Sequence, residues 1–130
     1  MSIRPVSTSM APQAVGPYSQ AIESGGLLYC SGQIPLPPEG GSLVAGGIRE
    51  QTEQVLRNLS NLLQAGGSDL THVLKTTVYL TDLANFKDMN EVYARVFNNH
   101  KPARATIQAA ALPMGALVEI EAIAAIIRPV

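Results

Sequence analysis

The sequence contains no tryptophan, a single cysteine and few other aromatic residues, four Tyr and two Phe among 130 residues. A core without large rings has to be built mainly from aliphatic side chains and alanine. Because Cys30 has no partner cysteine, an intrachain disulfide and a cysteine-based metal site are both excluded. This cysteine usage fits a reducing compartment, so we expect a cytoplasmic protein in which Cys30 is a small buried apolar residue.

The sequence also lacks any concentration of charge and any long apolar run. Its ten acidic and nine basic residues are scattered and give a net charge of −1. A nucleic-acid surface normally needs a basic stripe, so we expect no nucleic-acid partner. No segment approaches about 18 uninterrupted apolar residues, and residues 1–12 lack the apolar centre of a signal peptide. We therefore expect no membrane partner and no leader.

Motifs for metals and cofactors are missing as well. His72 and His100 have no carboxylate or second histidine at metal-ligand spacing. Gly40-Gly41 and Gly46-Gly47 lack the lysine and hydroxyl residue, or the helix opening, of a phosphate-binding loop. The sequence thus predicts a protein that works without a metal ion or a cofactor.

Apolar periodicity and turn residues predict one domain over residues 1–130. The expected elements are strands near Ile3–Ser7, at Ala21–Ser24 and at Leu27–Cys30, a helix from Ile48 to Gly66-Gly67, a strand Val73–Leu80, a helix Asn85–Asn98, and strands Arg104–Ala110 and Leu117–Ile127. The first helix and the second show apolar stripes at helical spacing, and the strands are rich in β-branched residues. This order predicts an α+β fold, a single mixed sheet of six strands with two helices packed on one face.

Strand alternation predicts which side chains face the same way. Leu74, Thr76, Val78 and Leu80 should share one face of their strand. The final strand collects its apolar residues on one side: Ala116, Val118, Ile120, Ala122 and Ala124. Since no third helix is predicted to bury that side, we expect self-association to cover it.

Four short motifs hold the candidate functional residues. They are Gly16-Pro17-Tyr18-Ser19-Gln20, Cys30-Ser31-Gly32-Gln33, Pro102-Ala103-Arg104-Ala105 and Glu119-Ile120-Glu121-Ala122. Arg104 begins a strand and could bind a small carboxylate through two parallel hydrogen bonds, although an ordinary strand-end arginine has the same pattern. Glu119 and Glu121 point to one face of their strand, where burial would be costly; a solvated edge explains them equally well.

The first two motifs carry weaker indications. Tyr18 follows a Gly-Pro turn and could donate a hydrogen bond to a substrate, but a tyrosine in this place is by default a packing residue. Ser31 and Gly32 end the hairpin strand, where a missing Cβ lets a ligand approach the backbone; a simple strand-end turn is the alternative.

In this order and at these spacings, with Leu-Pro followed by Ile-Glu-Ala-Ile-Ala near the C-terminus, the four motifs resemble the RidA (YjgF/YER057c) family over the whole length. The resemblance implies a chorismate-mutase-like homotrimer with active sites in clefts between neighbouring subunits. It also implies the site residues. Arg104 would bind the substrate carboxylate, Tyr18 and the Ser31-Gly32 backbone would orient the substrate, and Glu119 would position or deprotonate water.

Three further positions bear on the resemblance. Thr106 stands where many family members have a cysteine, which removes a thiol role here but leaves attack by water intact. Asn90 matches a recurrent family asparagine, yet an exposed helical asparagine is the simpler interpretation, and we leave it outside the catalytic set. Glu121 is interpreted as structural.

The activity that the resemblance implies is hydrolysis of 2-imino acids, such as 2-iminopropanoate and 2-iminobutanoate formed from 2-aminoacrylate and 2-aminocrotonate, to 2-keto acids and ammonia. Its partners would be small 2-imino and 2-keto acids. A non-catalytic module that binds small carboxylates or keto acids remains an alternative. The near-neutral charge and the absence of paired histidines disfavour a ribonuclease or translation inhibitor. A chorismate mutase would need more cationic groups.

Overall fold

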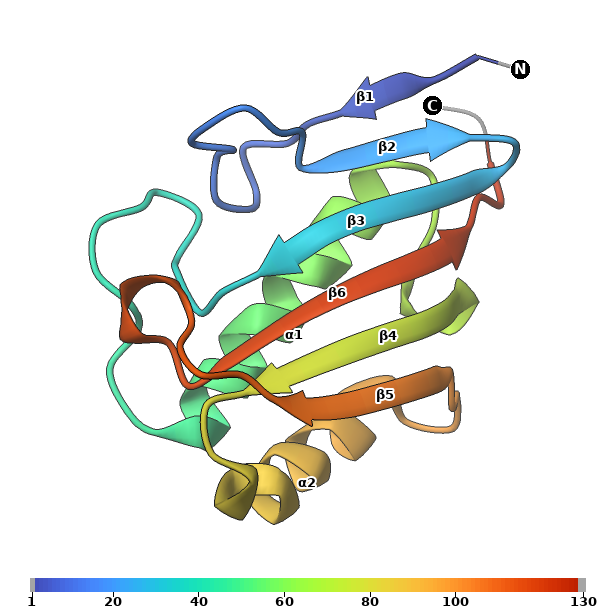
Figure 1. Cartoon of the computed structure of the whole chain (residues 1–130). Helices are drawn as coiled ribbons and strands as arrows, with labels where there is room; N and C mark the ends of the chain where they lie inside the picture. Colours follow the sequence, from blue (N-terminus) through green and yellow to red (C-terminus); the bar gives the residue numbers. More distant parts are fainter. Residues whose placement is uncertain (1, 129–130) are drawn as a thin grey trace.

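The computed structural model describes residues 2–128 as one sheet with two helices on a single face (Figure 1). The elements are β1 (Arg4–Val6), β2 (Ala21–Ser24), β3 (Leu27–Gln33), α1 (Ile48–Ala65), β4 (Val73–Leu80), α2 (Phe86–Phe97), β5 (Ala103–Gln108) and β6 (Val118–Ala125), with 3-10 turns at Leu70–His72, Leu83–Asn85 and Pro113–Gly115. The predicted α+β order is confirmed, and β3 runs three residues beyond the predicted end at Cys30.

The six strands form one mixed sheet in the order β1-β2-β3-β6-β4-β5. Only β4 and β5 are parallel, and α2 is the crossover that connects them. β6 returns to the middle of the sheet and pairs antiparallel with both β3 and β4. This topology leaves β1 and β5 as the two edges.

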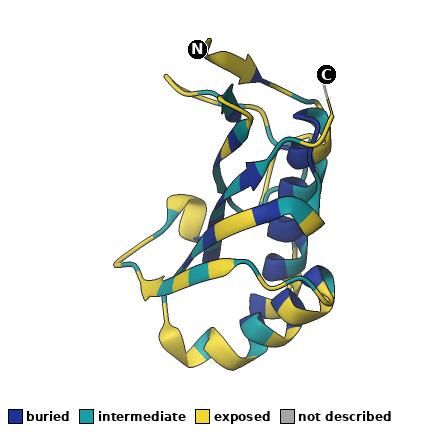
Figure 2. Cartoon of the chain, turned by 90° about the vertical axis from the view of Figure 1, so that its right-hand side faces the viewer, coloured by how far each residue is buried: buried dark blue, intermediate teal, exposed yellow. Residues whose placement is uncertain are grey.

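The core lies between the sheet and the helices. Figure 2 shows buried positions along the side of α1 that faces the strands. The apolar side of β6 belongs to this core, because Val118, Ile120, Ala122 and Ala124 are all buried. The prediction that this side awaits self-association is therefore wrong: the continuous apolar side of a strand packs where the helices are, and α1 covers it.

A bulge changes the predicted facing of β4. The register with β6 shifts between Val73 and Lys75, so Val73 joins Thr76 and Val78 in the core. Leu74 is half exposed, at 50%. The prediction for Leu74 is wrong because the extra residue of a bulge restarts the alternation.

The second face of the sheet is left open and carries both rings and carboxylates. Tyr29 lies opposite Ile123 across the β3–β6 pair, and Ile107 lies opposite Tyr79 across the β4–β5 pair. Tyr29 and Ile107 are each exposed by more than two fifths. Glu119 shares this face, because it lies opposite Tyr79 on the other side of β4.

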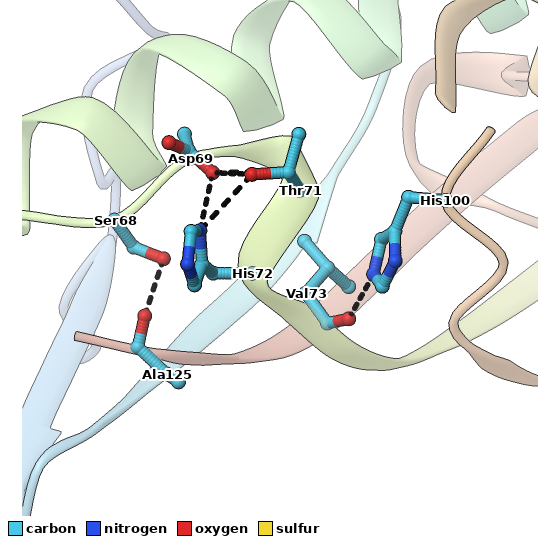
Figure 3. Close-up of polar contacts among 7 residues, drawn as sticks. All are labelled: Ser68, Asp69, Thr71, His72, Val73, His100 and Ala125. Carbon is cyan, nitrogen blue, oxygen red and sulfur yellow. Dashed lines mark hydrogen bonds and ion pairs between the residues drawn. The ribbon is translucent and has the colours of Figure 1, made fainter. Parts of the chain in front are cut away.

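Polar contacts hold the segments that precede β4 and follow β6, at the end of the sheet away from Gln33, the last residue of β3 (Figure 3). The Ser68 hydroxyl donates to the Ala125 carbonyl at 2.6 Å, His72 Nδ1 lies 2.8 Å from an Asp69 carboxylate oxygen, and His100 Nε2 donates to the Val73 carbonyl at 2.6 Å. Both histidines thus tie connecting segments. Within residues 2–128 no three His, Cys, Asp or Glu side chains gather as a metal site requires, and neither helix there is long and apolar enough to cross a bilayer.

Candidate functional site

The Arg104 side chain lies against helix α2, at the edge strand β5. Its guanidinium carbon is 4.8 Å from the ring centre of Tyr93 and 5.5 Å from that of Phe86. Nη1 donates to Asn90 Oδ1 at 2.7 Å. Cation–π contact and this hydrogen bond fix the plane of the guanidinium, while its other N–H groups make no hydrogen bond to residues 2–128 and are available to a carboxylate.

Helical spacing explains why α2 can hold Arg104. Phe86, Asn90 and Tyr93 are separated by four and three residues, so they form one stripe on the helix. The Tyr93 hydroxyl shares a 2.7 Å hydrogen bond with the Thr76 hydroxyl inside the core, which fixes the ring under the guanidinium. Phe86 and Tyr93 belong to the apolar stripe from which the sequence predicts this helix, and a stripe of that kind indicates packing alone. Their spacing relative to Asn90 is the signal that would have shown their second role.

Asn90 also differs from its prediction. It is half-buried and accepts a hydrogen bond from Arg104, rather than being an exposed helical residue. Arg104 and Asn90 line a pocket of about 400 Å³ at the C-terminal end of α2. Close by on the same strand, the buried hydroxyl of Thr106 has no hydrogen-bond partner within residues 2–128.

The second group of candidate residues meets on the other side of the sheet, where β3 ends. The Glu119 side chain packs directly on the backbone of Gly32: a Cβ built on Gly32 would lie 2.8 Å from Glu119 Cδ. Any larger residue at position 32 would therefore displace this carboxylate from its place on the β3 backbone. The Ser31 hydroxyl donates to the Ser19 carbonyl at 2.6 Å, and the Ser31 amide donates to the Gln20 carbonyl at 2.9 Å, which fixes the end of β3 to the Tyr18 loop.

Tyr18 lies at the mouth of a groove that it shares with Gly32. Its amide donates to the Gly16 carbonyl at 2.9 Å and so closes a tight turn across Pro17. Gly16 itself has φ 129°, a value that favours glycine. The ring is 54% exposed. The groove has a volume of about 390 Å³. The structure thus brings Tyr18, Ser31, Gly32 and Glu119 to one end of the sheet.

The two carboxylates of β6 differ in their surroundings. Burial raises the pKa of Glu119, and the negative charge of Glu121 raises it further. Glu119 forms no ion pair or hydrogen bond with any side chain among residues 2–128. Glu121 accepts a 2.6 Å hydrogen bond from the Tyr79 hydroxyl, whose pKa that bond raises to about 12. Glu121 is thus engaged structurally, whereas Glu119 is available as a base.

The candidate residues of one chain fall into two separate groups. We call Arg104 with Asn90 the arginine half-site, and we call the other group, Tyr18, Ser31, Gly32 and Glu119, the glutamate half-site. Arg104 aligns with the buried Thr76, on the face that the helices cover. Glu119 aligns with Tyr79, on the open face. Because directly opposed residues of paired strands point to the same face, Arg104 and Glu119 lie on opposite sides of the sheet. A single chain does not bring all five predicted residues together.

Comparison with known proteins extends over nearly the whole chain. The family model described as Endoribonuclease L-PSP matches residues 8–126. An Arabidopsis thaliana chain named Reactive Intermediate Deaminase A, chloroplastic is 52% identical over 119 residues, which cover 92% of this chain and 64% of that one, less than two thirds of its length. A Homo sapiens chain named 2-iminobutanoate/2-iminopropanoate deaminase is 49% identical over 121 residues, 93% of this chain and 88% of that one.

Solved structures give the same result for the fold. Yeast Mmf1 superposes with a TM-score of 0.93 at 42% sequence identity, over 96% of this chain and 99% of the yeast chain. The range of the family model includes both half-sites, from Tyr18 to Glu119.

Proposed function

Since this chain belongs to the endoribonuclease L-PSP family, which contains the reactive intermediate deaminases, we propose that it is a 2-iminobutanoate/2-iminopropanoate deaminase. It converts 2-imino acids and water to 2-keto acids and ammonia. The observation that carries this proposal is the half-buried Glu119 carboxylate, which packs on Gly32 without an ion-pair partner among residues 2–128. A carboxylate in that state can accept a proton from water.

The reaction needs one anchor and one proton relay. The fork of N–H groups on Arg104 binds the carboxylate of the substrate, with the guanidinium plane held by Asn90 and Tyr93. Glu119 takes a proton from water as the oxygen attacks the imine carbon, and the proton passes to the imine nitrogen. The resulting carbinolamine then loses ammonia: its hydroxyl proton passes to the departing nitrogen, the C–N bond breaks, and the hydroxyl oxygen becomes the keto oxygen.

The raised pKa of Glu119 suits this relay. A base is most effective when its pKa approaches the working pH, and burial beside Glu121 moves Glu119 in that direction. Free imines already hydrolyse in water, so positioning and one proton transfer suffice for the acceleration. Every step uses groups of this chain, without a metal ion or a cofactor.

A homotrimer would unite the two half-sites. In it, Arg104 of one subunit would face Tyr18, Ser31, Gly32 and Glu119 of its neighbour. Two observations support this arrangement: one chain separates Arg104 from Glu119 by the sheet, and the open face exposes Tyr29 and Ile107 where a partner could bury them. With a single free and buried cysteine, the protein needs no oxidising compartment, and we place the reaction in the cytoplasm.

The test couples an amino-acid oxidase to this protein and follows the decay of the imine. Wild type should accelerate decay, Arg104→Ala should abolish the acceleration, and Arg104→Lys should restore only a small part because an ammonium lacks the planar fork. No acceleration by wild type, beside tight binding of a keto acid in a titration, would instead support a binding module. RNA cleavage that persists in an Arg104→Ala, Glu119→Ala double variant would belong to a contaminant.

A further inference from the structure

The groove beside Tyr18 and Gly32 is more apolar than the proposed reaction requires. Six apolar residues from three loops line it: Pro12, Val15, Ile34, Leu36, Pro113 and Met114. The steps above use only its mouth. Resting on the proposed function, we infer that this groove, which we call the side-chain groove, binds the side chain of the 2-imino acid and selects substrates with long apolar chains.

One wall of the side-chain groove is fixed by a buried glutamine. Gln20 is only 3% exposed, and its side-chain amide is already hydrogen-bonded to the backbone of the preceding loop. Its Oε1 accepts from the Thr8 amide at 2.8 Å, and its Nε2 donates to the carbonyls of Thr8 at 3.1 Å and Pro12 at 2.7 Å. The loop that carries Pro12 and Val15 is therefore held in place before any ligand arrives.

The facing wall is fixed in the same way by an asparagine of α1. Asn58 is fully buried, and its Nδ2 donates to the carbonyls of Ile34 at 3.2 Å and Leu36 at 2.8 Å. Its Oδ1 accepts from Gln54 at 2.9 Å, so this amide too is satisfied. Gln33, a third buried amide in the lining, donates through Nε2 to the Ser31 carbonyl at 3.3 Å. Since these amides are held by the protein's own backbone and the other lining groups are mostly apolar, a preformed groove of this kind suits an apolar group.

The third wall can adapt to its occupant. Met114 has φ 59° and ψ 17°, in the left-handed region that a non-glycine residue rarely adopts, between Pro113 and Gly115. Such a conformation is retained where the surrounding structure or a function requires it. Its side chain is 56% exposed, and methionine is the most adaptable apolar side chain. Chains of different length could therefore fill the groove.

The position of the groove decides which part of the substrate it receives. Gly32 lies both under Glu119 and in the wall of the groove, so the imine carbon and the groove adjoin. In the proposed trimer the carboxylate of the substrate extends toward Arg104 of the neighbouring subunit, which leaves the substituent on the imine carbon for the groove. A volume of about 390 Å³ greatly exceeds what the methyl group of 2-iminopropanoate fills.

A straight-chain substrate series tests this inference. The oxidase generates imines from alanine, 2-aminobutyrate, norvaline and norleucine, and kcat/KM of the trimer is measured for each. Burial of a methylene group should raise kcat/KM about fourfold per added carbon in wild type. In Met114→Asn the new asparagine can adopt the left-handed backbone but makes the wall polar. This variant should lower the ratio of kcat/KM for the norleucine imine to that for the alanine imine by about tenfold.

Matched variants separate the groove from general effects. Met10 has nearly the same exposure, 59%, but lines no part of the groove, so Met10→Asn should keep the wild-type series. Val15→Asn changes the opposite wall at an exposed position and should flatten the series even if Met114→Asn fails to fold. If kcat/KM of wild type does not change with chain length while hydrolysis of the alanine imine is still accelerated, the groove does not bind the side chain, but the deaminase function stands. Failure with all four imines rejects both.

Discussion

Glu119 and Glu121, two residues apart on β6, share the open face but differ in their contacts. Tyr79 donates a hydrogen bond to Glu121, while Glu119 packs on Gly32. The charge of Glu121 also raises the pKa of its neighbour, after burial, which is the larger cause. A residue that is structural by its contacts can therefore influence the reaction through its charge.

Glu121→Gln should move the pH dependence of the reaction. The amide oxygen of glutamine can still accept from Tyr79, but the charge is lost, so the pKa of Glu119 should fall while remaining raised by burial. As the proposed base, Glu119 would act only when ionised, so activity should be lost as pH falls through its pKa. The acid limb of the kcat/KM profile should consequently shift to lower pH. Glu23→Gln, which removes a carboxylate paired with Arg4 far along the sheet, should leave the limb in place.

Gly32→Ala should affect activity far more than folding. The added methyl group would collide with Glu119, whose side chain is long enough to turn away. Displacing a reacting group by about 1 Å can lower a rate about a hundredfold, and we expect that loss in kcat/KM with a near-native circular dichroism spectrum. Gly47→Ala is the matched control, because a Cβ there meets nothing within 4 Å. Equal activity of the two variants would show that Glu119 does not need its place over Gly32.

At the scale of elements, periodicity and turn residues predicted the order of helices and strands correctly. They did not predict for every strand which side chains face the core. The bulge at Leu74 in β4 leaves no mark in the alternation of residue types, so the sequence could not reveal it. The apolar side of β6 was predicted correctly, but not that α1 packs on it. Which face of the sheet the helices pack on depends on the crossover through α2 and on the return of β6 to the middle of the sheet. The role of Asn90 depended on the same crossover, which aligns α2 with β5.

Two buried threonines offer a test of the packing of these elements. Thr52 on α1 has a buried hydroxyl without a partner among residues 2–128, whereas the Thr76 hydroxyl on β4 bonds to Tyr93. Thr52→Val should raise the free energy of unfolding by about 1 kcal/mol, since an unsatisfied polar group becomes apolar. Thr76→Val should lower it by about 1–3 kcal/mol, because the Tyr93 hydroxyl loses its partner. Urea denaturation at one protein concentration measures both, and a loss in each would contradict the hydrogen-bond assignment.

At the scale of the whole molecule, the family resemblance of the four motifs named Arg104 and Glu119, but no motif could tell that one sheet lies between these two residues. Their facing follows from pairing: Arg104 with Thr76, and Glu119 with Tyr79. The proposed trimer turns this separation into a prediction, because each site would take its arginine half-site from one subunit and its glutamate half-site from the next.

Mixed trimers of two inactive variants should therefore regain activity. Arg104→Ala keeps the glutamate half-site intact, and Glu119→Gln keeps the arginine half-site. When the two are unfolded together in equal amounts and refolded, each interface has a chance of about one in four of joining two intact half-sites, so about a quarter of wild-type activity should return. Each variant refolded alone is the control, and light scattering measures whether the refolded protein is a trimer. Sites contained within single subunits would instead leave the mixture as inactive as its components.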